Sequence, residues 1–235
     1  MFYRIAYSMI ALYARIICRR KITGQKHIPE RGPFIVVVNH LSTVDPPLVL
    51  SMLPVRLRMT GMAAMAHRHD FFIGWLMDQC GAIWVRRGQS DRRALHQALE
   101  VLSSGRPIGL APEGTRSDTG ALIEGKSGAA YLALKADVPI LPMAITGSED
   151  VYAHLKRLRR ARVGVKIGPM FYLPPREDGK RSAHLQYCTD LIMGRLASML
   201  PEPYRGVYVG HPLVAYWEAL DASGQADRPE WKREP

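Results

Sequence analysis

The sequence has few cysteines and no apolar run long enough to cross a membrane. Its three cysteines, Cys18, Cys80 and Cys188, are widely separated and match no metal-binding or redox spacing. This usage favours a reduced, cytosolic compartment. Near the N-terminus, the longest stretch without a charge covers residues 5–14, whereas a transmembrane helix needs about 20 apolar residues. A signal peptide is disfavoured too, because basic residues close the segment and no small-residue cleavage site follows.

Acidic residues are scarce relative to basic ones. The chain has 32 lysines and arginines against 21 aspartates and glutamates, a formal net charge of +11 at pH 7. Such a charge indicates a polyanionic partner, which can be a nucleic acid, an anionic membrane surface or a phosphorylated substrate. Nucleic acid is disfavoured, because aromatic residues make up only 8% of the chain and no RNA-binding signature is present.

The remaining composition is that of an ordinary folded protein. Apolar residues make up 47% of the 235 residues and charged residues 23%, which excludes a disordered chain and suits one domain with an ample core.

A short β-branched run at residues 34–38 is typical of a strand that is buried on both faces. Asn39 and His40 follow directly, and Asp45 comes five positions after His40, before two prolines. Because a residue before proline disfavours helical dihedrals, Asp45 is predicted to cap a helix that begins at Pro46. The intervening loop allows the carboxylate to fold back onto one imidazole nitrogen and to leave the other as a base.

Taken alone, this pair also fits a plain helix cap beside a histidine that is bonded to backbone. Ser42 lies between the two residues, but no G-x-S-x-G turn surrounds it, so a serine hydrolase is disfavoured.

Two arginines follow a second predicted strand, at residues 81–85. Arg86 and Arg87 would lie at the carboxyl end of this strand, where open α/β sheets bind ligands, and there they suit a phosphate group. A solvated basic turn is the alternative interpretation.

The block EGTRS follows a third predicted strand, at residues 107–112. Gly114 would let a ligand approach the backbone, Thr115 and Ser117 offer hydroxyl donors, and Arg116 offers a planar fork for phosphate. Glu113 would repel phosphate, so we expect it to accept a hydrogen bond from a glycerol hydroxyl or to hold an arginine in place.

Strand and helix patterns alternate along the rest of the chain. Further strands are predicted at residues 138–145 and 163–167, and helices at residues 90–105, 129–136 and 182–200. Pro139 and Pro142 predict that the strand at 138–145 is edge-like or irregular. The alternation predicts an α/β fold with a mainly parallel, mixed sheet flanked by helices.

The first 21 residues combine apolar side chains with one polar stripe. At helical spacing, the stripe contains Arg4, Ser8, Ala11, Arg15 and Arg19. This balance predicts an amphipathic helix that lies in the membrane interface, with its arginines at the headgroups. The alternative is an ordinary helix that packs on the domain.

Four ordered blocks, NHLSTVD, GAIWVRRG, APEGTRS and VPILPMAITG, resemble the glycerolipid acyltransferases, especially the 1-acylglycerol-3-phosphate acyltransferases. The resemblance covers roughly residues 22–210. It implies the glycerolipid acyltransferase fold, His40 as general base oriented by Asp45, and a glycerol phosphate site at 113–117 with at least one of the two arginines on the phosphate. The sequence departs from the family after the strand at 34–38, because it lacks the lysine usually found there and has a shorter link to Gly74.

The predicted function is therefore transfer of an acyl group to the sn-2 hydroxyl of lysophosphatidic acid (1-acyl-glycerol 3-phosphate), giving phosphatidic acid. The expected partners are this acceptor, acyl-CoA or acyl carrier protein as donor, and an anionic membrane at the cytoplasmic face. No metal, cofactor or nucleic acid is expected.

Other interpretations stay open. The acceptor could be glycerol 3-phosphate, another lysophospholipid or a glycolipid, and a noncatalytic basic protein that binds RNA or membrane is the alternative of another class. The dense basic run at residues 156–162 fits a solvated surface, headgroup contact or an acidic acyl donor. The predicted organisation is a membrane-docking helix at 1–21, an acyltransferase domain at 22–213 and a tail at 214–235.

Overall fold

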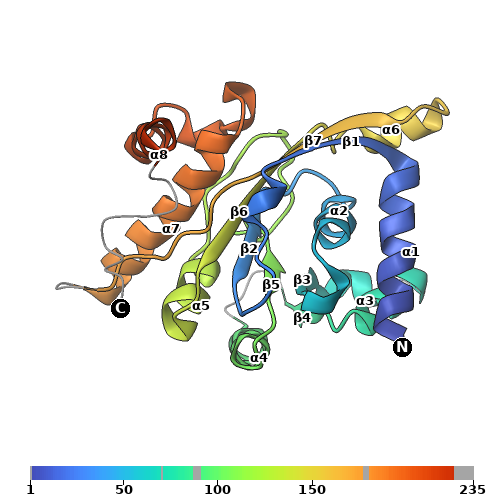
Figure 1. Cartoon of the computed structure of the whole chain (residues 1–235), viewed down its shortest axis with the longest axis horizontal. Coiled ribbons are helices and arrows are strands. Elements are labelled where there is room, and N and C mark those ends of the chain that lie inside the picture. The colour runs from blue at the N-terminus through green and yellow to red at the C-terminus, as the bar shows by residue number, and fades with distance from the viewer. Residues whose placement is uncertain (1, 70, 87–90, 177–179, 225–235) are drawn as a thin grey trace.

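The computed structural model describes residues 2–69, 71–86, 91–176 and 180–224, and it has one seven-stranded sheet between two layers of helices (Figure 1). The strands are β1 (Cys18–Thr23), β2 (Ile35–Val38), β3 (Thr60–Ala64), β4 (Ile83–Val85), β5 (Ile108–Leu110), β6 (Ile140–Thr146) and β7 (Ala161–Ile167). The helices are α1 (Phe2–Ile17), α2 (Asp45–Met52), α3 (Phe71–Gln79), α4 (Arg92–Ser103), α5 (Gly128–Ala136), α6 (Val151–Lys156), α7 (Arg181–Met199) and α8 (Pro212–Ser223).

The sheet is mainly parallel, as the sequence predicts. Its strand order is β1-β7-β6-β2-β5-β3-β4, and the β6–β7 pair is antiparallel while the other pairs are parallel. The carboxyl ends of β2, β5, β3 and β4 therefore meet at one edge of the sheet. The loops that begin with Asn39, Ala111 and Arg86 leave the sheet at this edge.

Two apolar clusters fill the space between the sheet and its helices. One lies under α4, α5, α7 and α8, and the other under α1 and α2 on the opposite side (Figure 1). All four residues of β2 are buried, which agrees with the unbroken β-branched run that predicted this strand. The central strand thus fixes the position of the histidine loop that follows it.

The strand at residues 138–145 was predicted to be edge-like or irregular, and the edge position is wrong. In the structure β6 lies inside the sheet, between β7 and β2. Its Ile140 bridges to Phe171, and pairing with β7 begins only at Met143. Pro142 stands between these two pairings, where a missing N–H breaks no regular ladder.

The N-terminal segment is part of the domain rather than an appendage. The helix α1 ends at Ile17, and the next residues form β1, which pairs with β7 from Cys18 to Thr23. The expected boundary at residue 21 therefore falls inside a strand. The sequence pattern hid this strand because the helical spacing of Arg15 and Arg19 continues into it.

The C-terminal region also differs from expectation. Instead of a tail from residue 214, α8 packs on α7, buries Trp217 completely and pairs Asp221 with Arg195 at 2.8 Å. Only residues 225–235 lie outside the described part of this region. No helix within the described residues is long and apolar enough to cross a membrane.

Candidate active site

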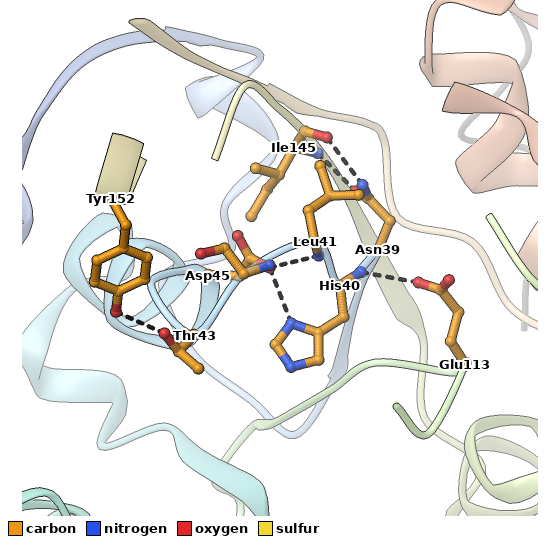
Figure 2. A network of polar contacts seen from close by, with 9 residues as sticks. Asn39, His40, Leu41, Thr43, Asp45, Glu113, Ile145 and Tyr152 are labelled. Atoms are coloured by element: carbon orange, nitrogen blue, oxygen red, sulfur yellow. Dashed lines mark hydrogen bonds and ion pairs between the residues drawn. The ribbon is translucent and has the colours of Figure 1, made fainter. Parts of the chain in front are cut away.

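His40 and Asp45 meet at the end of β2, as the sequence predicts. The His40 Nδ1 lies 2.9 Å from the Asp45 Oδ2 (Figure 2). Asp45 is 1% exposed, whereas the His40 side chain is 16% exposed. An Nδ1–H that donates to the carboxylate leaves Nε2 as the unprotonated, accepting nitrogen. In Figure 2, Nε2 faces away from Asp45, so it can receive a proton from a ligand.

Asp45 holds the loop as well as the imidazole. Its Oδ2 also accepts hydrogen bonds from the amides of Leu41 and Ser42, at 2.7 Å each. Asp45 was predicted to be the helix cap, but it is the first residue of α2, and Val44 occupies the N-cap position. The carboxylate turns back over the histidine loop instead of capping the helix, and this geometry fixes the loop relative to His40.

Glu113 holds the histidine from the other side. The His40 amide donates to Oε1 at 2.8 Å (Figure 2), and the Ile123 amide donates to Oε2 at 3.2 Å. The carboxylate is thus engaged with two backbone amides rather than with an arginine, and the residue is only 1% exposed. Burial raises the pKa of Glu113, and the two amide hydrogen bonds reduce that rise.

Asn39 is a site residue that the sequence analysis missed. Its buried side chain donates to the Ile145 carbonyl at 2.9 Å and accepts from the Ile145 amide at 2.7 Å. This pairing imitates a strand ladder and ties the start of the histidine loop to β6. Its position directly after a buried strand was the available signal, because a buried amide must find partners.

The EGTRS block contacts the histidine loop through its backbone. The Ser117 amide donates to the His40 carbonyl at 2.9 Å. The Ser117 hydroxyl, expected as a substrate donor, instead donates to the Ala121 carbonyl at 2.5 Å. Arg116 is exposed and Thr115 is half-buried, so both can meet a ligand beside His40.

Gly114 has a φ of +69°, which favours glycine. A Cβ there would come within 2.9 Å of the Lys126 Cδ, so the missing side chain makes room for Lys126. This packing brings an additional cation to the loop that holds Arg116.

The arginines after β4 are only partly described. The Arg86 side chain is exposed, and its amide donates to the Asp91 carboxylate at 3.0 Å. Arg87 lies outside the described residues. The same edge of the sheet therefore presents Arg86 and the EGTRS loop. Among the described residues, no cluster of histidine, cysteine and acidic side chains could hold a metal ion.

Known proteins share this architecture. A solved structure, the 1-acyl-sn-glycerophosphate acyltransferase PlsC from Thermotoga maritima, matches with a TM-score of 0.62 and 25% identity over 81% of this chain and 78% of that chain. The lyso-ornithine lipid O-acyltransferase of Pseudomonas aeruginosa is 32% identical over 149 residues, which cover 57% of this chain and 56% of the relative. The mouse 1-acyl-sn-glycerol-3-phosphate acyltransferase alpha is 29% identical over 160 residues, 63% of this chain and 53% of the relative.

The chain spans about half the length of these curated relatives. A family model described as acyltransferase matches residues 19–146, which is more than half of the chain and includes His40, Asp45 and the EGTRS block. The chain belongs to this acyltransferase family.

Proposed function

We propose that this protein transfers a fatty acyl group from an acyl thioester to the sn-2 hydroxyl of 1-acyl-glycerol 3-phosphate, which gives phosphatidic acid. The observation that carries the proposal is the His40–Asp45 contact of 2.9 Å beside the EGTRS loop. The mouse relative and the Thermotoga structure, both named as acyltransferases for 1-acyl-glycerophosphate, support this acceptor.

The reaction is direct transfer. His40 Nε2 takes the proton from the acceptor hydroxyl while the oxygen attacks the thioester carbonyl. The new C–O bond forms, the C–S bond breaks, and the leaving thiolate takes the proton from the imidazolium. Asp45 stabilises the imidazolium through Nδ1–H. No covalent acyl-enzyme is needed, because the thioester is already activated and the acceptor is positioned.

The acceptor phosphate would bind at the exposed cations of the same edge. Arg116 is the main candidate, and Arg86 and Arg87 are the further predicted contacts, with Thr115 as a hydroxyl donor. Glu113 supports this site from within, because it holds the His40 amide.

The protein would work as a peripheral protein at the cytoplasmic face, with acyl-CoA or acyl carrier protein as donor. Besides its buried face, α1 presents an apolar stripe to solvent, formed by Phe2, Ile5, Met9, Leu12, Tyr13 and Ile16. These positions recur at three and four residues, so they share one side of the helix. A stripe of this kind, flanked by arginines, suits the membrane interface.

A second acceptor is favoured by one observation. The 32% identical relative is named for lyso-ornithine lipid, and this chain lacks the lysine that its resemblance leads us to expect soon after the strand at 34–38. A lyso-ornithine lipid carries no glycerol phosphate, so it would need fewer phosphate contacts.

The test is an assay of the purified protein with a panel of acceptors. Lysophosphatidic acid, lyso-ornithine lipid and glycerol 3-phosphate are each offered with acyl-CoA and with acyl carrier protein thioester. We expect the highest kcat/KM with lysophosphatidic acid. A higher kcat/KM with lyso-ornithine lipid would show that this lipid is the acceptor instead. The absence of transfer to every acceptor would overturn the proposal.

A further inference from the structure

The turn between α6 and β7 exposes a large apolar residue among arginines. Leu158 is 98% exposed and has a φ of +54°, a backbone conformation that a leucine rarely adopts. Its neighbours Arg157 and Arg159 are exposed as well. We call residues 156–162 the basic turn. Transfer of this exposed apolar side chain from water to an apolar environment would be favourable.

A cationic hollow lies at the base of this turn. It has a volume of about 610 Å³. Its lining consists of four arginines, one histidine, one leucine and one aspartate: Arg19, Asp150, His154, Leu158, Arg159, Arg160 and Arg162. The excess of positive charge suits a phosphate group, which arginine guanidinium groups bind in a planar, bidentate manner.

The basic turn is fixed to the C-terminal end of α1. The Arg160 guanidinium donates to the carbonyls of Arg15 and Cys18, the latter at 2.7 Å. Ala161 begins β7 opposite Cys18 of β1. The phenol groups of Tyr13 and Tyr152 interact, which adds a contact between α1 and α6. Figure 1 shows α6 beyond the C-terminal end of α1, so the basic turn lies next to the end of the helix that carries the apolar stripe.

We propose that the basic turn is a second membrane-contact element, in which Leu158 enters the headgroup region while Arg157, Arg159 and the hollow bind phosphates of anionic lipids. This inference rests on the membrane docking in the proposed function. An anionic bilayer complements both features at once, because its phosphates match the arginines and its acyl boundary covers Leu158. It also covers the adjoining apolar stripe of α1, which a separate acidic protein on the turn would leave exposed.

Vesicle co-sedimentation tests whether Arg157 and Arg159 contribute to the binding of anionic membranes. The full-length protein is mixed with vesicles of phosphatidylcholine, alone or with phosphatidylglycerol, at low and at physiological salt. Arg157→Gln/Arg159→Gln keeps Arg160, which holds α1, and should weaken binding to the anionic vesicles on the order of 30-fold at low salt. The matched control, Lys180→Gln/Arg181→Gln, removes two exposed charges at the start of α7 and should bind like wild type.

A second measurement reports insertion. Leu158→Cys is labelled with a nitroxide, since the native cysteines are buried, and Val209→Cys, at an exposed site near α8, is the control. On anionic vesicles, the label at 158 should become more accessible to oxygen and less accessible to a water-soluble nickel chelate. The label at 209 should show no such change.

The outcomes separate this inference from the proposed function. Wild-type vesicle binding by Arg157→Gln/Arg159→Gln, or a label at 158 that stays in water on bound protein, would overturn it. The inference would also be overturned if this variant bound vesicles normally but had a raised KM for acyl carrier protein thioester. That result would show that the basic turn binds the acidic donor protein. Acyl transfer to a short-chain, soluble acceptor should proceed at the wild-type rate in Arg157→Gln/Arg159→Gln. If the wild-type protein itself transferred no acyl group to this acceptor, that result would count against the proposed function instead.

Discussion

Two buried carboxylates hold His40, and each acts on a different part of it. Asp45 contacts the imidazole, where it sets the tautomer, while Glu113 contacts the backbone amide and no ring atom. Asp45 therefore fixes the ring together with the loop that follows it, whereas Glu113 fixes only the main chain at His40. A substitution of Asp45 should impair proton transfer itself, whereas a substitution of Glu113 should misplace the base.

Glu113→Gln should lower kcat and leave the donor KM unchanged. The glutamine side chain has a single acceptor oxygen, so one of the two amides, that of His40 or Ile123, loses its partner. A lost hydrogen bond to a charged group costs about 1.5–3 kcal/mol, or roughly 10–150-fold in rate if it is expressed fully in the transition state. The control is Glu124→Gln, which changes an exposed neighbour. Equal rates for both variants would contradict the positioning role.

The same variant carries a pH signature. Burial raises the folded-state pKa of Glu113 above its ordinary value of 4.5, so the native state binds this proton more readily than the unfolded chain. Ionisation of Glu113 then costs stability as the pH rises between the unfolded and folded values. Urea unfolding across weakly acidic pH should show wild type losing stability relative to Glu113→Gln as the pH increases. A relative gain would mean that the pKa is lowered instead.

Arg116→Ala should raise the KM for the acceptor more than the KM for the donor. Its guanidinium is exposed beside the histidine loop, and loss of a charge-assisted contact costs about 1.5–3 kcal/mol, roughly 10–150-fold in apparent affinity. Arg181→Ala, at the start of α7, serves as the control. A raised donor KM with an unchanged acceptor KM would show that Arg116 binds the donor rather than the acceptor.

At the residue scale, the His40–Asp45 pair was predictable because both partners lie within one short loop. Asn39 and Glu113 were harder to interpret, since their partners are 106 and 73 residues away along the chain. Only the sheet order brings β6 and the EGTRS loop beside the end of β2. Spacing within a motif does not contain that information.

At the element scale, α6 connects the N-terminal helix to the histidine loop. The Tyr152 hydroxyl lies 2.6 Å from the Thr43 hydroxyl (Figure 2), and the Tyr152 ring also interacts with Tyr13 of α1. Thr43 is in the loop between His40 and Asp45. This contact is exposed, so its effect should be small and should concern the order of the loop.

Tyr152→Phe should lower kcat a few-fold and leave both KM values unchanged, since one hydrogen bond contributes about 0.5–1.5 kcal/mol. The ring stays in place, so packing is preserved. The comparison is Tyr187→Phe, which alters an exposed tyrosine on α7. A change in acceptor KM without a change in kcat would show that Tyr152 contacts substrate instead.

The elements themselves were predictable to different degrees. The buried β-branched run of β2 and the amphipathic pattern of α4 predicted both elements within a few residues. β1 was missed, because its sequence CRRKIT is polar and its strand character depends on pairing with β7. β6 was misplaced, because the prolines that usually mark an edge stand here at a local break in pairing.

At the scale of the whole molecule, the N-terminal segment both completes the fold and exposes an apolar stripe, which we propose contacts the membrane. Ala6, Ile10, Ala14 and Ile17 are buried in the cluster under α2, while the hydroxyls of Tyr3 and Tyr7 donate to the carbonyls of Met59 and Leu53. The opposite side of α1 carries the exposed apolar stripe. Removal of the helix would therefore affect both properties together.

A truncated chain that starts at Ile22 should be markedly less stable than wild type. It loses four of the six residues of β1 and the buried Ile10 and Ile17, each of which contributes about 1.5–3 kcal/mol by burial. Thermal unfolding followed by circular dichroism measures this loss. Leu12→Ser/Ile16→Ser alters only exposed residues of the stripe, so it should keep the wild-type Tm and bind vesicles more weakly. A truncated chain with the wild-type Tm would show that the segment is an appendage after all.

The most direct test of the central claim is the single-turnover rate of acyl transfer in His40→Ala, measured with saturating lysophosphatidic acid and acyl thioester. General-base catalysis contributes about 10²–10⁴-fold, and we expect His40→Ala to lose at least that factor while its circular dichroism and Tm match wild type. Asp45→Asn should lose activity by a smaller factor. A folded His40→Ala protein that transfers the acyl group at the wild-type rate would contradict the account.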